Sequence, residues 1–227
     1  YAQVRKSGDR YLLYKAADKA KDQTYFLACL NQEQLSRIQF PLGGLTKQEV
    51  RAIAEENGFV NARKHDSQDI CFIPDGDYTA FLERYTGKHY PAGDFLDETG
   101  RVVGKHRGAV CYTLGQRKGL YLGGMKGEKE EGRWFVVKKD LPNNILYVSH
   151  GDESPLYSVS CEVSGMNWIP SSPVAERGRT FDCYAKFRYR QPDQAVRVTV
   201  KDDGGLHIDF KEKQRAVTEG QFAVLYD

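Results

Sequence analysis

The residue of this sequence with the clearest capacity for chemistry is Cys71, in the stretch Asp66–Ile73. Polar residues precede it, and the apolar run Ile70–Ile73 stops at the turn-forming residues Pro74-Asp75-Gly76. This pattern predicts a short buried strand whose polar lead-in could expose a reactive thiol to substrate. A cysteine in a strand can equally be a small core residue, and the pattern alone leaves both interpretations open.

Charged residues beside Cys71 would set the protonation state of its thiol. Three basic side chains would favour the reactive thiolate, and two carboxylates would oppose it. These residues are Arg63, Lys64, His65, Asp66 and Asp69. The balance depends on distances that a sequence does not contain.

Two other stretches have cations at spacings that suit phosphate. In Phe181–Arg190 apolar and polar residues alternate, which predicts a strand with Cys183 on its apolar face and three cations on the other. These cations, Lys186, Arg188 and Arg190, would lie about 7 Å apart, as phosphates do along a nucleic acid strand. The basic, glycine-containing stretch Gly115–Gly119 is compatible with a close approach of backbone to phosphate. Each pattern is also typical of a solvated surface that binds nothing.

The N-terminal third contains helices and strands in alternation, which indicates part of an α/β layer. The pattern predicts a strand over residues 10–17, and then a helix capped by Asp22 with Cys29 on its apolar stripe. A second helix begins at the capping box formed by Thr46 and Glu49, buries one apolar face and stops near Gly58. Residues 59–62 lead from this helix into the stretch around Cys71.

Beyond residue 77 the pattern becomes mainly β. A short helix is expected from Asp77 to Gly87, followed by a hairpin over residues 93–100 and strands over 108–114, 134–138 and 144–149. From about Tyr157 onward, strands separated by turns roughly every ten residues predict a small antiparallel barrel or sandwich. The charged residues 126–133 are expected to be a disordered or solvated tip.

Composition is that of an ordinary globular chain. Of its 227 residues 40% are hydrophobic, and the net charge is +2. The small charge excludes a strongly basic protein, although a local basic patch could still bind nucleic acid. No apolar run approaches the ~20 residues of a membrane helix, so we expect a cytoplasmic protein. Five widely spaced cysteines without a C-x-x-C pair predict reduced thiols, with neither a disulfide framework nor a zinc site.

Several blocks of the sequence, taken together and in order, resemble the tRNA-specific 2-thiouridylase (MnmA or TrmU) family. The blocks are Lys21-Asp22-Gln23-Thr24-Tyr25-Phe26-Leu27, Phe40-Pro41-Leu42-Gly43, Asp66-Ser67-Gln68-Asp69-Ile70-Cys71-Phe72-Ile73, Tyr112-Thr113-Leu114-Gly115-Gln116-Arg117-Lys118-Gly119-Leu120 and Arg188-Tyr189-Arg190-Gln191. The resemblance implies an α/β remnant of a PP-loop (Rossmann-like) ATP-pyrophosphatase domain over residues 1–75. A mainly β central domain over 76–155 and a C-terminal antiparallel β-barrel over 156–227 would follow.

The resemblance also implies a reaction and a set of functional residues. ATP, with Mg²⁺, would adenylate the C2 oxygen of the wobble uridine in tRNAs for Lys, Glu and Gln, and a persulfide on Cys71 would supply sulfur. A cysteine desulfurase or a sulfur relay protein would load that persulfide. The positions that match tRNA-contacting residues are Lys21, Asp22, Gln23, Arg188, Tyr189 and Gln221.

The family's Ser-Gly-Gly-x-Asp-Ser ATP motif is absent from this sequence, as is the second catalytic cysteine that would form a disulfide with Cys71. Tyr1 is not an initiator methionine, and the chain stops within a predicted strand. We therefore expect a fragment that does not thiolate tRNA by itself. The alternative is a noncatalytic RNA-binding β-barrel module in which Cys71 is structural. A PP-loop amidating enzyme is disfavoured, because such enzymes resemble this family only in the missing part.

Overall fold

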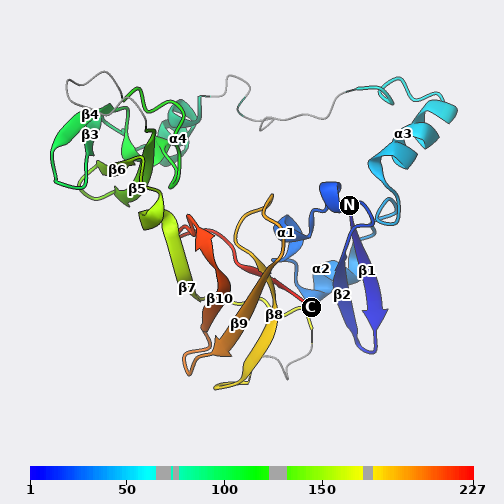
Figure 1. The fold of residues 1–227 in the computed structure, drawn as a ribbon. Coiled ribbons are helices and arrows are strands. Elements are labelled where there is room, and N and C mark those ends of the chain that lie inside the picture. Colours follow the sequence, from blue (N-terminus) through cyan, green and yellow to red (C-terminus); the bar gives the residue numbers. More distant parts are fainter. Residues whose placement is uncertain (65–72, 74–76, 123–131, 171–175) are drawn as a thin grey trace. The chain divides into compact units, whose positions relative to one another are not determined.

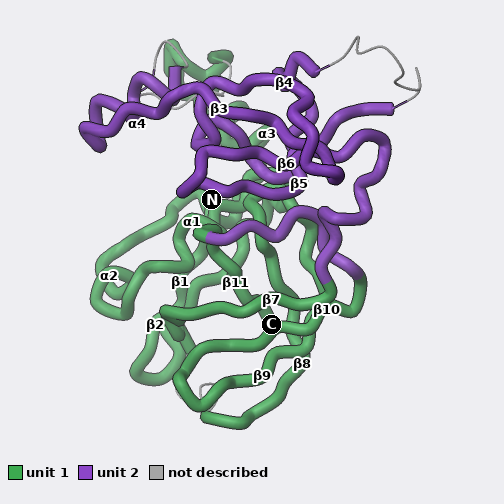
Figure 2. The backbone as a smooth tube through the Cα atoms, turned by 90° about the vertical axis from the view of Figure 1, so that its left-hand side faces the viewer, with its two compact units in different colours: residues 1–65, 159–212, 220–227 green, residues 66–158, 213–219 purple. Residues whose placement is uncertain are grey.

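The structure, a computed structural model, describes residues 1–64, 73, 77–122, 132–170 and 176–227. Their chain forms two compact units, each assembled from separate segments (Figure 2). The first unit comprises residues 1–65, 159–212 and 220–227, and the second comprises 66–158 and 213–219. Strands in three sheets dominate the described fold, and helices are few and short (Figure 1).

The first unit begins with an antiparallel hairpin of β1 (Ala2–Ser7) and β2 (Arg10–Lys15). The 3-10 helix η1 (Lys19–Lys21) and the short helices α1 (Thr24–Leu27) and α2 (Gln32–Arg37) follow. Gln32 fixes α2 to β2, since its amide accepts from Tyr11 N at 2.8 Å and donates to Tyr11 O at 3.0 Å. The strand predicted over residues 10–17 is thus confirmed, although it stops at Lys15.

The single helix that the sequence predicts after Asp22 is instead two helices. Asn31 starts α2 with its own capping box to Gln34, which interrupts the apolar stripe. As a result Cys29 is exposed and Phe26 is 60% exposed. The prediction that Cys29 lies in the core is therefore wrong.

Helix α3 (Lys47–Glu56) has the predicted capping box, with Thr46 accepting from Glu49 N and Glu49 bonded to Thr46 N. Its end is a Schellman motif, because Gly58 (φ +69°) donates to Glu55 O and Phe59 N donates to Ala54 O. No residue of α3 is buried, so the expected buried face is not observed within the described chain. Residues 60–63 form turns.

A five-stranded sheet completes the first unit, in the order β11-β8-β9-β10-β7. Figure 1 shows β7, β10, β9 and β8 of this sheet. Its strands are β7 (Tyr157–Val163), β8 (Thr180–Lys186), β9 (Gln194–Val200), β10 (Leu206–Arg215) and β11 (Val224–Tyr226). Alternate residues of β9 and the start of β10 are fully or almost fully buried and supply its core. This confirms the predicted run of antiparallel strands.

The predicted strand over residues 181–190 is four residues too long. β8 ends at Lys186, and residues 187–190 bend into a turn in which Gln191 N donates to Arg188 O. The side chain of Gln191 stabilises this turn by accepting from Phe187 N at 2.9 Å. Because Arg188 and Arg190 leave the strand, the expected row of three equally spaced cations does not form.

The second unit is built on a four-stranded sheet in the order β4-β3-β6-β5. Its strands are β3 (Gly93–Leu96), β4 (Val102–His106), β5 (Trp134–Asp140) and β6 (Ile145–His150), and β3 pairs with β6 in parallel. Helix α4 (Tyr78–Thr86) begins at the Asp77 cap and ends at Gly87 (φ +66°), as predicted. Phe95, Val136 and Leu146 are fully buried at the centre of its core.

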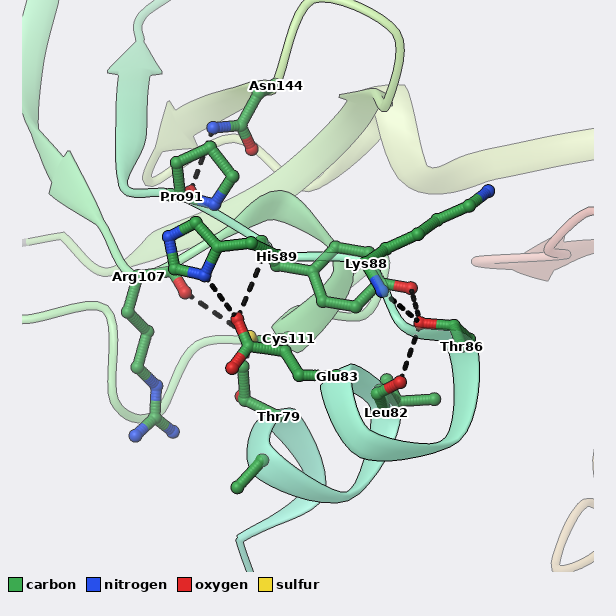
Figure 3. Close-up of polar contacts among 12 residues, drawn as sticks. Thr79, Leu82, Glu83, Thr86, Lys88, His89, Pro91, Arg107, Cys111 and Asn144 are labelled. Carbon is green, nitrogen blue, oxygen red and sulfur yellow. Dashed lines mark hydrogen bonds and ion pairs between the residues drawn. The ribbon is translucent and has the colours of Figure 1, made fainter.

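Residues 108–114 are not the predicted strand, because they contain the 3-10 helix η2 (Ala109–Cys111). Gly108 (φ +106°) starts this helix, and Asn144 holds it by accepting from Ala109 N while donating to Pro91 O. Cys111 faces α4, where its sulfur lies 2.8 Å from Thr79 Oγ1 (Figure 3). A second 3-10 helix, η3 (Ser154–Leu156), precedes β7. The described helices are all too short or too polar to span a membrane.

Candidate nucleic-acid interface

Three segments of the first unit that are far apart in sequence meet at one place. They are the turn from η1 to α1, the loop after β8 and the loop before β11. They contain all six residues singled out as contacts: Lys21, Asp22, Gln23, Arg188, Tyr189 and Gln221. The second and third segments are distant in the sequence. The antiparallel pairing of β8 with β11 brings them together.

Asp22 organises the first of these segments from within. It is 7% exposed, and its Oδ2 accepts from Ala16 N at 2.7 Å. Its Oδ1 accepts from Thr24 N at 3.1 Å and from Thr24 Oγ1 at 2.5 Å. Both carboxylate oxygens therefore accept hydrogen bonds from the chain itself. These bonds fix the positions of the residues on either side of Asp22.

Gln23 and Tyr189 link the first segment to the second. Gln23 Nε2 donates to the Tyr189 hydroxyl at 2.5 Å. The Tyr189 ring packs on Phe26, with centroids 4.5 Å apart and planes tilted by 38°. Since Phe26 remains 60% exposed, this pair forms an aromatic platform that is open to solvent.

Tyr25 links the second segment to the third. Its hydroxyl lies 3.3 Å from Phe187 O and 3.1 Å from Phe222 O, and its side chain is buried. Burial raises the pKa of Tyr25, and the nearby Arg188 guanidinium opposes that rise. Gln221 is exposed beside Phe222, which is itself 60% exposed.

Contacts of Tyr226 stabilise β11, the strand that follows the third segment. Lys15 Nζ lies 3.9 Å from the centre of the Tyr226 ring and also pairs with Asp193. Tyr226 bonds to Thr24 Oγ1 at 3.2 Å, and burial is the main cause that raises its pKa to about 12. Tyr226 is thus a neutral phenol that closes the base of the cluster at neutral pH.

The arrangement offers cations and aromatic faces to a ligand. Lys19 and Arg190 are exposed at its edges, with no ion pair to any described residue. Cations beside exposed rings suit a phosphodiester chain with unstacked bases. Phe26 was not singled out from the sequence as a contact, because its spacing placed it on the apolar stripe of a helix. Its position inside the Lys21–Leu27 block, which resembles the family, was the signal that could have marked Phe26 as a candidate contact.

Cys71 and its neighbours Asp66 and Asp69 lie outside the described residues, as does His65. Ile73, at the end of the same stretch, is described and is 3% exposed. Arg63 pairs with Glu55 at 3.2 Å, so part of its charge is already compensated. The role expected for Cys71 therefore stays a prediction.

The described cysteines Cys29, Cys111, Cys161 and Cys183 are free thiols. Burial is the main cause that raises the pKa of Cys161 and of Cys183 to about 11, which keeps both protonated at neutral pH. Cys183 thus behaves as the structural residue that its strand position predicts. Among residues that the structure describes, no cluster of histidine, cysteine or carboxylate side chains is placed to hold a metal ion.

Three family models match the chain in succession. Residues 1–75 match the tRNA methyl transferase HUP domain, 79–150 the tRNA methyl transferase PRC-barrel domain and 158–227 the aminomethyltransferase beta-barrel domain. Together with the three sheets, these matches confirm the predicted fold class, an α/β remnant followed by two mainly β domains. The exact domain boundaries stay a prediction.

Curated relatives match over the whole chain. A protein named tRNA-specific 2-thiouridylase MnmA from Halalkalibacterium halodurans is 49% identical over 230 residues, which is 100% of this chain and 59% of the relative. Proteins of the same name from Mycoplasma capricolum and Hahella chejuensis are 47% and 44% identical, again over 100% of this chain and over 60% and 61% of their own lengths. The chain thus spans about three fifths of the length of these relatives, and on these matches it belongs to the tRNA-specific 2-thiouridylase (MnmA) family.

Proposed function

We propose that this chain supplies the tRNA-binding surface and the sulfur-carrying cysteine of an enzyme that converts a tRNA uridine to 2-thiouridine. The observation that carries the proposal is identity of 44–49% over the whole chain to proteins named for that activity. The interface of the first unit supports it, since its exposed rings and cations suit single-stranded RNA.

In this proposal, tRNA binds along the surface made by Gln23, Phe26 and Tyr189. Phe26 stacks on an unpaired base, and the hydrogen bond from Gln23 holds the Tyr189 ring against Phe26. Lys21, Arg188 and Gln221 contact the adjoining backbone. Asp22 takes the role of a positioning residue, because its oxygens are bonded within the chain.

Cys71 carries the sulfur as a persulfide. The C2 oxygen of the uridine first attacks the α-phosphate of ATP, a Mg²⁺-bound substrate, so that AMP is attached to that oxygen and pyrophosphate leaves. The terminal persulfide sulfur bonds to C2 as the C2–O bond breaks, and AMP leaves with that oxygen. A second thiol then attacks Cys71 Sγ, so that the S–S bond breaks, 2-thiouridine is released and a disulfide forms. A thiol reductant then reduces this disulfide and restores both thiols. The sequence contains neither the Ser-Gly-Gly-x-Asp-Ser motif nor a cysteine that matches the second thiol, so neither step is assigned to a residue here.

The partners follow from this chemistry. The substrate is a tRNA with a wobble uridine, such as those for Lys, Glu and Gln, and the sulfur comes from a cysteine desulfurase or a relay protein. We also propose a cytoplasmic location for the protein.

Replacement of the thiol tests the catalytic assignment. In the full-length protein, Cys71→Ser should abolish 2-thiouridine formation while tRNA affinity is unchanged. Cys29→Ser is the matched control, because Cys29 is an exposed thiol of the first unit and should be dispensable. After incubation with a desulfurase and cysteine, mass spectrometry should find the added sulfur on Cys71. Thiolation by Cys71→Ser would refute the assignment, and absence of the persulfide would favour a noncatalytic RNA-binding module.

The same preparation tests the binding surface. Phe26→Ala removes the exposed ring, and loss of one base stack costs about 1–3 kcal/mol, so the Kd for tRNA should rise about 5- to 150-fold. Turnover at saturating tRNA should remain. An unchanged Kd would exclude Phe26 from the interface.

A further inference from the structure

The second unit holds a basic loop, residues 117–122, that the interface above does not use. Its base is fixed to the sheet, because Gly115 N donates to Val136 O at 2.8 Å and Val136 N donates to Gln116 O at 3.0 Å. Leu120, which is 3% exposed, and the partly buried Leu122 pack against the core on either side of Tyr121. These anchors hold Arg117, Lys118 and Tyr121 at the surface.

The polar and aromatic side chains of this loop are exposed, and its two cations make no ion pair with a described residue. Arg117 and Lys118 are exposed, and neither has an ion pair with a described residue. Tyr121 is 97% exposed and adopts a left-handed backbone (φ 53°), which is unusual for a residue with a large side chain. Tyr121 is thus an exposed ring in a costly backbone conformation, next to two cations that make no ion pair with a described residue. This arrangement indicates a role in ligand binding rather than in core packing.

A shallow cavity adjoins this loop in the same unit. Its volume is about 430 Å³, and its lining includes Arg117, Lys118, Tyr121 and Arg133. None of the described residues that line it carries a carboxylate. Trp134 forms part of the wall, is 9% exposed, and its Nε1 has no hydrogen-bond acceptor among the described residues. The cavity thus offers three cations and a spare donor, all of which favour an anion.

We propose that residues 117–122, with Arg133, bind the phosphate backbone of RNA at a second contact region. This inference rests on the proposed function, which supplies tRNA as the ligand. Cations beside a fully exposed aromatic ring fit a sugar–phosphate chain with an accessible base, because the phosphates pair with the cations while the base stacks on the ring. An acidic protein surface would use the cations alone and leave Tyr121 without a role.

The test measures tRNA binding by the full-length protein at salt concentrations from about 50 to 200 mM. Removal of two phosphate contacts in Arg117→Gln/Lys118→Gln should reduce the slope of log K against log salt by about 1.4–1.8. If binding at 1 M salt is unchanged, that loss weakens binding about 25- to 60-fold at 0.1 M salt. Tyr121→Ala should weaken binding without changing the slope.

Arg84→Gln/Lys88→Gln is the matched control, because it removes two exposed cations at α4 in the same unit. Equal effects of the two double variants, or an unchanged slope in the loop variant, would overturn the proposal. Normal RNA binding with slower sulfur acceptance from a desulfurase would also overturn it and identify an acidic protein as the ligand. Activity of Cys71→Ser would refute the proposed sulfur chemistry but would leave this binding result intact, so the two failures are distinguishable.

Discussion

Asp22→Asn separates a positioning role from a direct contact with RNA. The substitution keeps the shape of the side chain but replaces one carboxylate oxygen by an NH₂ group. If the amide oxygen stays with Thr24, the new NH₂ faces Ala16 N–H, which now donates to Oδ2 at 2.7 Å. Two donors then oppose each other in a site where the side chain is 7% exposed.

The expected cost follows from these contacts. A hydrogen bond to a charged acceptor is lost, and a buried N–H is left without a partner, which together cost about 2–3 kcal/mol of the free energy of unfolding. The melting temperature should fall by about 4–12 °C if the unit unfolds as a domain of ordinary size. Affinity for tRNA should fall with it, because Gln23 and Phe26 lose their fixed positions.

Urea unfolding measures the first quantity, and filter binding of tRNA at a temperature well below the transition measures the second. Asp9→Asn is the control, since Asp9 is exposed in the turn of the β1–β2 hairpin and makes the same charge change. It should alter the free energy of unfolding by less than about 0.5 kcal/mol. If Asp22→Asn is as stable as Asp9→Asn and yet binds tRNA poorly, Asp22 contacts RNA directly and the positioning argument is refuted.

Two further predictions concern titrating groups. Iodoacetamide at pH 8 should modify exposed Cys29 faster than Cys183, because burial shields the Cys183 thiol and raises its pKa to about 11. Peptide mass spectrometry measures both rates, and equal rates would contradict the assigned burial. The pKa of His207 should lie above its usual value of about 6.5, chiefly because His207 bonds to Glu162 Oε1 at 2.7 Å and, secondarily, to Asp209. A raised pKa means that the folded state favours the protonated ring, so this contribution to stability is present below the unfolded pKa and is lost as pH rises through the folded one. NMR titration should show the shift, Glu162→Gln should reduce it, and an unshifted wild-type His207 would exclude the pairing.

Local signals in the sequence determined the elements that depend on near neighbours. The capping box of Thr46 and Glu49 predicted the start of α3, and Asp77 and Gly87 predicted both ends of α4. The alternation of apolar residues over 181–190 predicted β8, although not its end, because a strand with one buried face must repeat every two residues. The sequence blocks also identified the family, because the order of motifs along a chain can be read without knowing which residues contact each other.

The tertiary structure alone decided what the site contains. The sequence predicted Arg188 and Arg190 on a strand, but β8 ends where its pairing with the short β11 begins, at Lys186 opposite Val224. Strand ends depend on such distant partners, which no local pattern reports. The same holds for Phe26, whose helical spacing suggested burial but which is 60% exposed, with the Tyr25 and Tyr189 rings beside it. Burial is a property of packed segments, so the helical spacing of Phe26 could not show that this ring lies on the surface beside Tyr189, which is 163 residues further along the chain.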